Sequence, residues 1–192
     1  MPLDAPRRLQ PHGLAPWVAT RLEELDPPVD VVGHSLGALV AARVAAARPE
    51  LVRRLVLIAP PGIRRRPAAA YAWPLARTVV ASHPRLLARI TRDALRAGPR
   101  NLVRGGLHAT DADVSRELPS VTAPTLLVWG ARDRLVPVLD AAAWHERLPD
   151  ARLVVLPRAS HVPMVESPDE LVDAIVAFRE ELLDERGDDG RA

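Results

Sequence analysis

The sequence of 192 residues contains no cysteine and no lysine. The absence of cysteine excludes disulfide bonds, thiolate metal sites and a cysteine nucleophile, and makes a cytoplasmic location the simplest expectation. All 26 basic residues are arginine, and they are interleaved with 24 acidic residues, so the net charge is only +2. Nucleic-acid binding usually needs basic residues gathered in one tract. We therefore expect no nucleic-acid partner.

A long uncharged hydrophobic run is also missing. The alanine-rich stretch from Ala38 to Ala47 is interrupted by Arg43, and the segment after Met1 has no apolar region behind a basic start. These features predict neither a membrane span nor a secretory signal. Hydrophobic residues make up 48% of the chain and charged residues 26%. This composition, at this length, is typical of one globular domain.

Short apolar runs alternate with helix-like segments along the chain. The predicted strands are Val29 to Gly33, Leu55 to Ala59, Thr125 to Trp129 and Leu153 to Leu156. Helices are predicted from Leu14 to Leu25, from the alanine-rich stretch to about Arg48, and after Ser167, which has the position of an N-cap before Pro168. Continuous apolar strands that alternate with helices indicate an α/β fold with a mostly parallel sheet and helices on both faces.

The segment 61–122 breaks this alternation and reads as a helical lid or cap inserted into the domain. Residues 1–60 and 123–192 would then form the core. Within the predicted lid, four arginines fall on one helical face, opposite an apolar face formed by Leu87, Ile90 and Ala94. The arginines are Arg85, Arg89, Arg92 and Arg96. A solvated face is the simplest interpretation, and attraction of a carboxylate-bearing substrate is the alternative.

The sequence Gly-His-Ser-Leu-Gly at 33–37 lies between a predicted strand and a predicted helix. A serine hydroxyl becomes a useful nucleophile when it is exposed on a tight turn, near a base and near backbone N–H groups. In such a turn we expect a Cβ at either Gly33 or Gly37 to clash. The motif therefore makes Ser35 a candidate nucleophile. His34 is more consistent with lining or tuning the site than with acting as its base.

Two further candidates follow later strands. Asp133 comes after the third strand and His161 after the fourth. Because the carboxyl ends of parallel strands meet at one edge of a sheet, Ser35, Asp133 and His161 should converge there as nucleophile, acid and base. Asp140 and Asp150 are alternatives for the acid, but the first lies well beyond its strand and the second precedes the next one. No cluster suggests a metal site.

These motifs resemble the α/β-hydrolase fold superfamily, in which the nucleophile, acid and histidine occur in this order. The resemblance covers roughly residues 14–184, and it extends to Trp129-Gly130, Pro137, Pro163 and Glu166. It implies a serine hydrolase that acts on an ester or related acyl bond without a cofactor.

The resemblance also implies further roles. The backbone N–H of Leu36 would belong to the oxyanion hole, and His34, Trp129, Val162 and Met164 would line the substrate pocket, although Trp129 and Met164 fit the core equally well. A carbon–carbon bond hydrolase or a lactonase would use the same triad. Dehalogenases and epoxide hydrolases of this fold are excluded, because they need an aspartate at position 35.

The beginning of the chain departs from the family pattern. Such hydrolases have four strands before the nucleophile strand, and the loop after the third supplies an oxyanion N–H. Only 28 residues precede Val29 here, and His12-Gly13 follows no apolar strand. We expect an N-terminally incomplete fold that corresponds to the C-terminal two-thirds of a longer hydrolase. A non-catalytic or weakly active remnant is then the alternative function, and the exposed edge of the first strand could mediate self-association.

Overall fold

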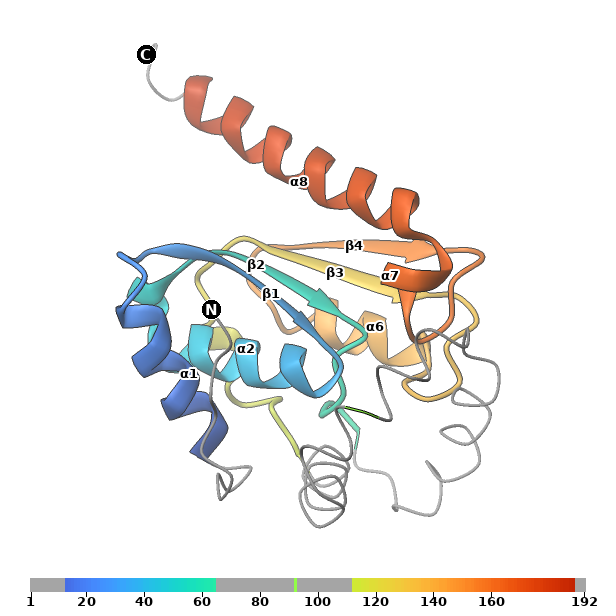
Figure 1. Ribbon diagram of the computed structural model, residues 1–192, viewed down its shortest axis with the longest axis horizontal. Coiled ribbons are helices and arrows are strands. Elements are labelled where there is room, and N and C mark those ends of the chain that lie inside the picture. Colours follow the sequence, from blue (N-terminus) through green and yellow to red (C-terminus); the bar gives the residue numbers. More distant parts are fainter. Residues whose placement is uncertain (1–12, 65–91, 93–111, 189–192) are drawn as a thin grey trace.

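The computed structural model describes residues 13–64, 92 and 112–188, and Figure 1 shows their arrangement. Four strands form one parallel sheet in the order β1-β2-β3-β4. They are β1 (Val29–His34), β2 (Val52–Ile58), β3 (Thr125–Gly130) and β4 (Ala151–Leu156). The α/β class and the parallel sheet are confirmed.

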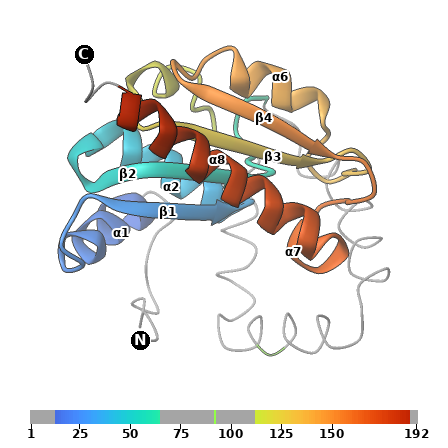
Figure 2. The same cartoon turned by 90° about the horizontal axis from the view of Figure 1, so that it is seen from above.

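Helices cover both faces of the sheet (Figure 1). The longer helices are α1 (Leu14–Glu23), α2 (Leu36–Ala47), α6 (Leu139–His145) and α8 (Pro168–Asp188). Shorter turns are η2 (Pro49–Leu51), η3 (Leu118–Ser120) and α7 (Pro163–Glu166). Helices α1, α2 and α6 lie on one face, and α8 crosses the other face diagonally (Figure 2). This layering divides the core into two hydrophobic clusters.

Alternation along the central strands assigns side chains to these two clusters. In β2, Leu55 and Leu57 belong to the cluster under α1 and α2, whereas Val56 and Ile58 face α8. The apolar face of α8 predicted from its spacing, formed by Leu171, Ile175, Phe178 and Leu182, packs in the second cluster. From Leu55 to Ile58 in β2 and throughout β3 both faces of the strand are buried, which explains the continuous apolar runs there.

Two strands begin earlier than hydrophobicity alone predicts. Strand β2 starts at Val52 because Arg53 and Arg54 are paired with the carboxylate of Asp30 on β1, at 2.9 and 3.0 Å. Strand β4 starts at Ala151, and the side chain of Arg152 pairs with Asp150 at 2.7 Å. Paired charges therefore extend each strand beyond its apolar run.

Most of the predicted lid, and with it the arginine face except Arg92, lies outside the described residues, as does His12 of the His12-Gly13 pair. Arg92 is exposed. The described end of the segment 61–122 packs in the core, because Val114, Leu118 and Val121 are buried in the cluster under α2. The division into core and lid stays a prediction. None of the helices in the described ranges is long and apolar enough to span a membrane.

Candidate active site

Ser35 occupies the turn between β1 and α2 with φ 52° and ψ −122°, a conformation that non-glycine residues seldom adopt. Such a backbone costs of order 1–3 kcal/mol and persists only where its surroundings impose it. Here the Ser35 N–H donates to the carbonyl of Ile58 at 2.9 Å, and the Ser35 carbonyl accepts from the N–H groups of Ala38 and Leu39. The turn is therefore held by β2 on one side and by the first turn of α2 on the other.

The two glycines that flank the turn have different roles. A Cβ added at Gly33 would lie 2.6 Å from the Cα of Ala38, so strand and helix can approach only because position 33 has no side chain. A Cβ at Gly37 would meet nothing within 4 Å among the described residues. The expectation that both glycines prevent a clash is correct for Gly33 and wrong for Gly37, which lies exposed on α2.

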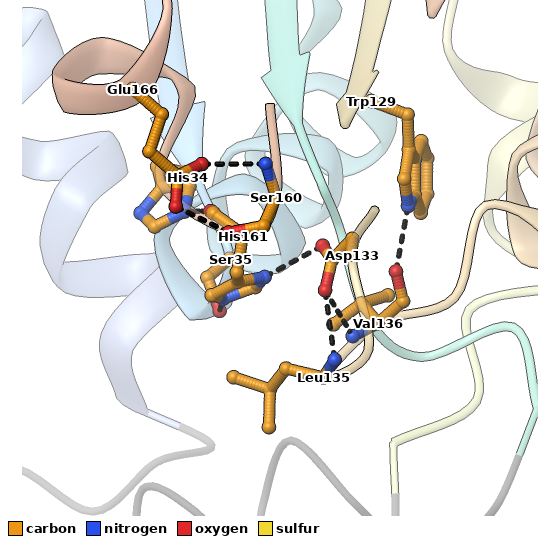
Figure 3. Close-up of polar contacts among 9 residues, drawn as sticks. All are labelled: His34, Ser35, Trp129, Asp133, Leu135, Val136, Ser160, His161 and Glu166. Carbon is orange, nitrogen blue, oxygen red and sulfur yellow. Dashed lines mark hydrogen bonds and ion pairs between the residues drawn. The ribbon is translucent and has the colours of Figure 1, made fainter. Parts of the chain in front are cut away.

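Asp133 lies buried in the loop after β3 (Figure 3). Its Oδ1 accepts the backbone N–H groups of Leu135 and Val136, at 2.8 and 2.9 Å, which leaves Oδ2 to face His161. The indole of Trp129 donates to the carbonyl of Val136 at 2.8 Å and so fixes the same loop from the core. The carboxylate is oriented before any substrate arrives.

His161 connects the other two predicted residues. Its Nδ1 lies 2.8 Å from Oδ2 of Asp133, and its Nε2 lies 3.1 Å from Oγ of Ser35. Only 5% of His161 and 6% of Asp133 is exposed. With Asp133 accepting the proton on Nδ1, a neutral imidazole presents an unprotonated Nε2 to the hydroxyl. The convergence of these three side chains, expected from the sheet topology, is present in the structure.

The loop that carries His161 is fixed at each residue by a different element. The carbonyl of Ala159 accepts the N–H of Arg132 at 3.0 Å. The N–H of Ser160 donates to Oε2 of Glu166 at 2.6 Å, and the Ser160 hydroxyl donates to the other oxygen of that carboxylate. Gly130 makes room for the loop, because a Cβ there would lie 2.0 Å from the carbonyl oxygen of Ser160. Figure 3 shows Glu166 and Ser160 beside the triad.

His34 is half-buried at the end of β1 and approaches the same loop. Its Nε2 lies 2.7 Å from the carbonyl oxygen of His161, and the two imidazole centroids are 4.9 Å apart. Burial lowers the pKa of His34 below its ordinary value, and the neighbouring His161 lowers it further. His34 is therefore neutral at neutral pH.

The other predicted site residues have the following positions. Leu36 is the first residue of α2, where backbone N–H groups have no partner within the helix. Trp129 is fully buried, Val162 precedes α7, and Met164 is exposed on α7. Their assignment to a substrate pocket stays a prediction.

The alternative acids lie elsewhere. Asp140 lies on α6 near Arg64, and Asp150 lies at the opposite end of the sheet, paired with Arg152. Within the described ranges, no group of three or more histidine, aspartate or glutamate side chains could hold a metal ion.

Sequence reasoning gave no role to Ser160 or Glu166, and it quoted Gly130 only as part of a motif. The signal for Gly130 is its position directly after an apolar strand, where only glycine allows another backbone to approach closely. A serine six residues before a glutamate is a weak pattern. Which carboxylate satisfies the Ser160 N–H depends on how α7 folds back over the loop, and local spacing does not report that.

Comparison with known proteins decides the family. The model of the alpha/beta hydrolase family matches residues 3–174, most of this chain. The chain belongs to that family. The resemblance drawn from the motifs is thereby confirmed.

Curated relatives of the chain are named pimeloyl-[acyl-carrier protein] methyl ester esterases. The protein from Neisseria meningitidis serogroup A is 31% identical over 84% of this chain and 60% of its own length. The one from Pectobacterium atrosepticum is 28% identical over 77% of this chain and 68% of its own length. The chain thus spans about three-fifths to two-thirds of the length of these two relatives.

Solved structures agree on the fold. A membrane phospholipase A, described as a bacterial virulence factor, superposes with a TM-score of 0.74 at 25% identity, covering 93% of this chain and 66% of its own. A hydrolase from Pseudomonas aeruginosa PA01 has a TM-score of 0.71 at 26% identity, covering 88% and 71%. The chain therefore matches about two-thirds of the length of each of these two structures.

Proposed function

We propose that this alpha/beta hydrolase family member is a serine hydrolase that cleaves a carboxylic ester or related acyl bond. The observation that carries the proposal is the continuous chain of contacts from Asp133 Oδ2 through His161 to Ser35 Oγ, at 2.8 and 3.1 Å. A hydroxyl held on a strained turn against a buried, correctly oriented imidazole is the arrangement that nucleophilic catalysis requires.

In the proposed reaction, Ser35 Oγ attacks the ester carbonyl carbon while His161 Nε2 takes its proton. The imidazolium is stabilised by Asp133, and it returns the proton to the leaving alcohol as the ester C–O bond breaks. Water then attacks the acyl-enzyme with His161 as base, which releases the carboxylic acid and regenerates Ser35. We assign the N–H of Leu36, at the positive end of α2, as a donor to the oxygen on which negative charge develops.

The chemistry of the three side chains and the names of the relatives both support the proposed substrate class. The triad needs only an acyl carbonyl with a leaving group, so small-molecule carboxylic esters are the proposed substrates. Methyl esters are the first to test, since the Neisseria and Pectobacterium relatives are named methyl ester esterases. The proposed reaction uses no cofactor, and the lack of cysteine supports a cytoplasmic location.

Turnover of short p-nitrophenyl esters tests the proposal. The native chain should release p-nitrophenol, and Ser35→Ala should lower kcat by at least about a thousandfold, because the nucleophile is lost. Ser120→Ala, an exposed serine in η3, is the matched control and should keep native activity. Equal activity in native chain and Ser35→Ala, or none in a folded native chain, would favour the non-catalytic remnant instead.

We also infer that the chain self-associates through β1. Strand β1 is the end strand of the described sheet, and Val32 on it is 58% exposed. An unpaired strand edge with exposed apolar side chains favours pairing with a second strand. Light scattering coupled to gel filtration should show a concentration-dependent dimer that Val32→Arg weakens. A strictly monomeric native chain would contradict this inference.

A further inference from the structure

His34 connects the strand end that precedes Ser35 to the loop that carries His161. It precedes Ser35 in the chain, and its imidazole contacts the backbone of His161 rather than the Ser35 hydroxyl (Figure 3). The Nε2 of His34 and the carbonyl oxygen of His161 are 2.7 Å apart. Because a carbonyl oxygen can only accept, Nε2 must carry the proton and donate it.

This contact fixes a part of His161 that its other contacts do not reach. Asp133 and Ser35 hold the two ring nitrogens of His161, whereas His34 holds the main-chain carbonyl. His34 and the nucleophile Ser35 are consecutive residues at the end of β1. The hydrogen bond therefore ties the backbone of the base to the side chain of the residue that directly precedes the nucleophile.

The surroundings of His34 favour its neutral form. The charged or titratable groups that act on it are His161, Asp133 and Glu166, which come from three different segments. Burial and His161 lower the pKa of His34, whereas the two carboxylates act in the opposite direction. A neutral His34 donates its hydrogen bond without adding a positive charge 4.9 Å from the ring that must become an imidazolium.

We propose that His34 is a positioning residue for His161, and that the required property is the N–H donor at Nε2. The inference rests on the proposed function, because it assigns His34 a part in the same site. It makes specific the expectation that His34 lines or tunes the site. A lining residue affects how tightly substrate binds, whereas a positioning residue affects the rate of the chemical step.

Two substitutions separate the donor from the ring. His34→Gln keeps an N–H donor at a similar distance from the backbone, and His34→Leu keeps a comparable volume without any donor. With p-nitrophenyl acetate, His34→Leu should lower kcat by about 10- to 100-fold and change KM by less than about threefold. His34→Gln should stay within about threefold of the native kcat.

Two outcomes would overturn the proposal. A raised KM with native kcat in His34→Leu would assign His34 to the substrate pocket. Equal losses in His34→Gln and His34→Leu would show that the donor is not what matters. If both variants melt at the native temperature, a loss of kcat confined to His34→Leu supports positioning rather than folding.

A second measurement needs no turnover and separates this proposal from the proposed function. The proton shared by His161 Nδ1 and Asp133 should give a downfield proton NMR signal in the native chain and in His34→Gln. In His34→Leu that signal should broaden or vanish, because the His161 backbone is released. A sharp, unshifted signal in His34→Leu overturns the positioning role. An inactive native chain that shows the expected signals contradicts only the proposed hydrolase activity.

Discussion

The two partners of the central hydrogen bond are held in place by different kinds of interaction. Ser35 is fixed by main-chain hydrogen bonds within its turn and by packing, because the absence of a side chain at Gly33 brings α2 against β1, and all residues of α2 from Ala38 to Ala42 are buried. His161 is fixed by polar contacts from Arg132, Glu166 and His34 to three consecutive residues of its loop. The nucleophile lies on a turn between a strand and a helix that belong to the core, whereas the base lies on a loop.

This difference has a physical consequence. Close packing between a strand and a helix resists displacement as a unit, so Ser35 moves only if the fold does. Hydrogen bonds at a loop contribute about 1 kcal/mol each and can be removed singly. Substitutions that crowd the contact between β1 and α2 should therefore reduce stability, and the removal of single polar contacts to the His161 loop should reduce activity while the fold is retained.

Among substitutions that leave the nucleophile and the base in place, the largest effect on activity should come from Asp133→Asn. The amide cannot hold the imidazole in the tautomer that presents a free Nε2 to Ser35, and kcat should fall by about ten-thousandfold. Ester turnover and thermal unfolding measured on the same sample check this. Asp140→Asn, which alters a buried carboxylate on α6, is the comparison variant and should keep kcat near the native value. Equal losses in the two variants would contradict the assignment of the acid.

Substitutions of Gly33 and Gly37 test how closely β1 and α2 pack around Ser35. Gly33→Ala should lower the free energy of unfolding by about 1–3 kcal/mol, because its Cβ would lie 2.6 Å from the backbone of Ala38. Gly37→Ala meets nothing within 4 Å in the described part of the chain, and should raise that free energy by up to about 1 kcal/mol through helix propensity. Urea unfolding measures both. A destabilised Gly37→Ala would show that this position is packed after all.

The strands and the three candidate catalytic residues could be predicted from the sequence, whereas several tertiary contacts could not. The alternation of apolar runs identified the four strands of the described sheet, and the Gly-His-Ser-Leu-Gly motif with the strand-end positions of Asp133 and His161 identified the residues that meet. Charged strand ends such as Arg53 and Arg152 were missed, because each pairs with a carboxylate that is distant in the sequence. The short helices α6 and α7 gave no clear periodic signal, and the contacts of His34 and Glu166 are set by tertiary folding.

Removal of the Glu166 carboxylate tests whether polar contacts hold the His161 loop in place. Glu166→Ala leaves the Ser160 N–H without its acceptor, so kcat should fall by about tenfold while stability changes by about 1 kcal/mol or less. Glu180→Ala removes another exposed carboxylate, on α8, and should change neither property. Steady-state kinetics and urea unfolding of the two variants provide the comparison. A native kcat in Glu166→Ala would mean that the loop keeps its position without this contact.

The smallest effect concerns pH. The folded chain lowers the pKa of His34 below 6.5, mainly through burial. The unfolded chain then binds more protons at His34 than the folded chain as the pH falls through about 6.5, so stability decreases on acidification. His34→Gln should make the dependence shallower between pH about 7.5 and about 5.5. Unfolding in urea at several pH values measures this, and identical slopes for the two proteins would contradict the expected shift.

Covalent labelling by a fluorophosphonate tests the central claim most directly, since it requires an activated serine but no particular substrate. Intact-mass spectrometry with peptide mapping should find one adduct, on Ser35, and His161→Ala should slow its formation by at least about a hundredfold. No adduct on the folded native chain, or labelling of Ser35 at the same rate without the imidazole, would contradict the account.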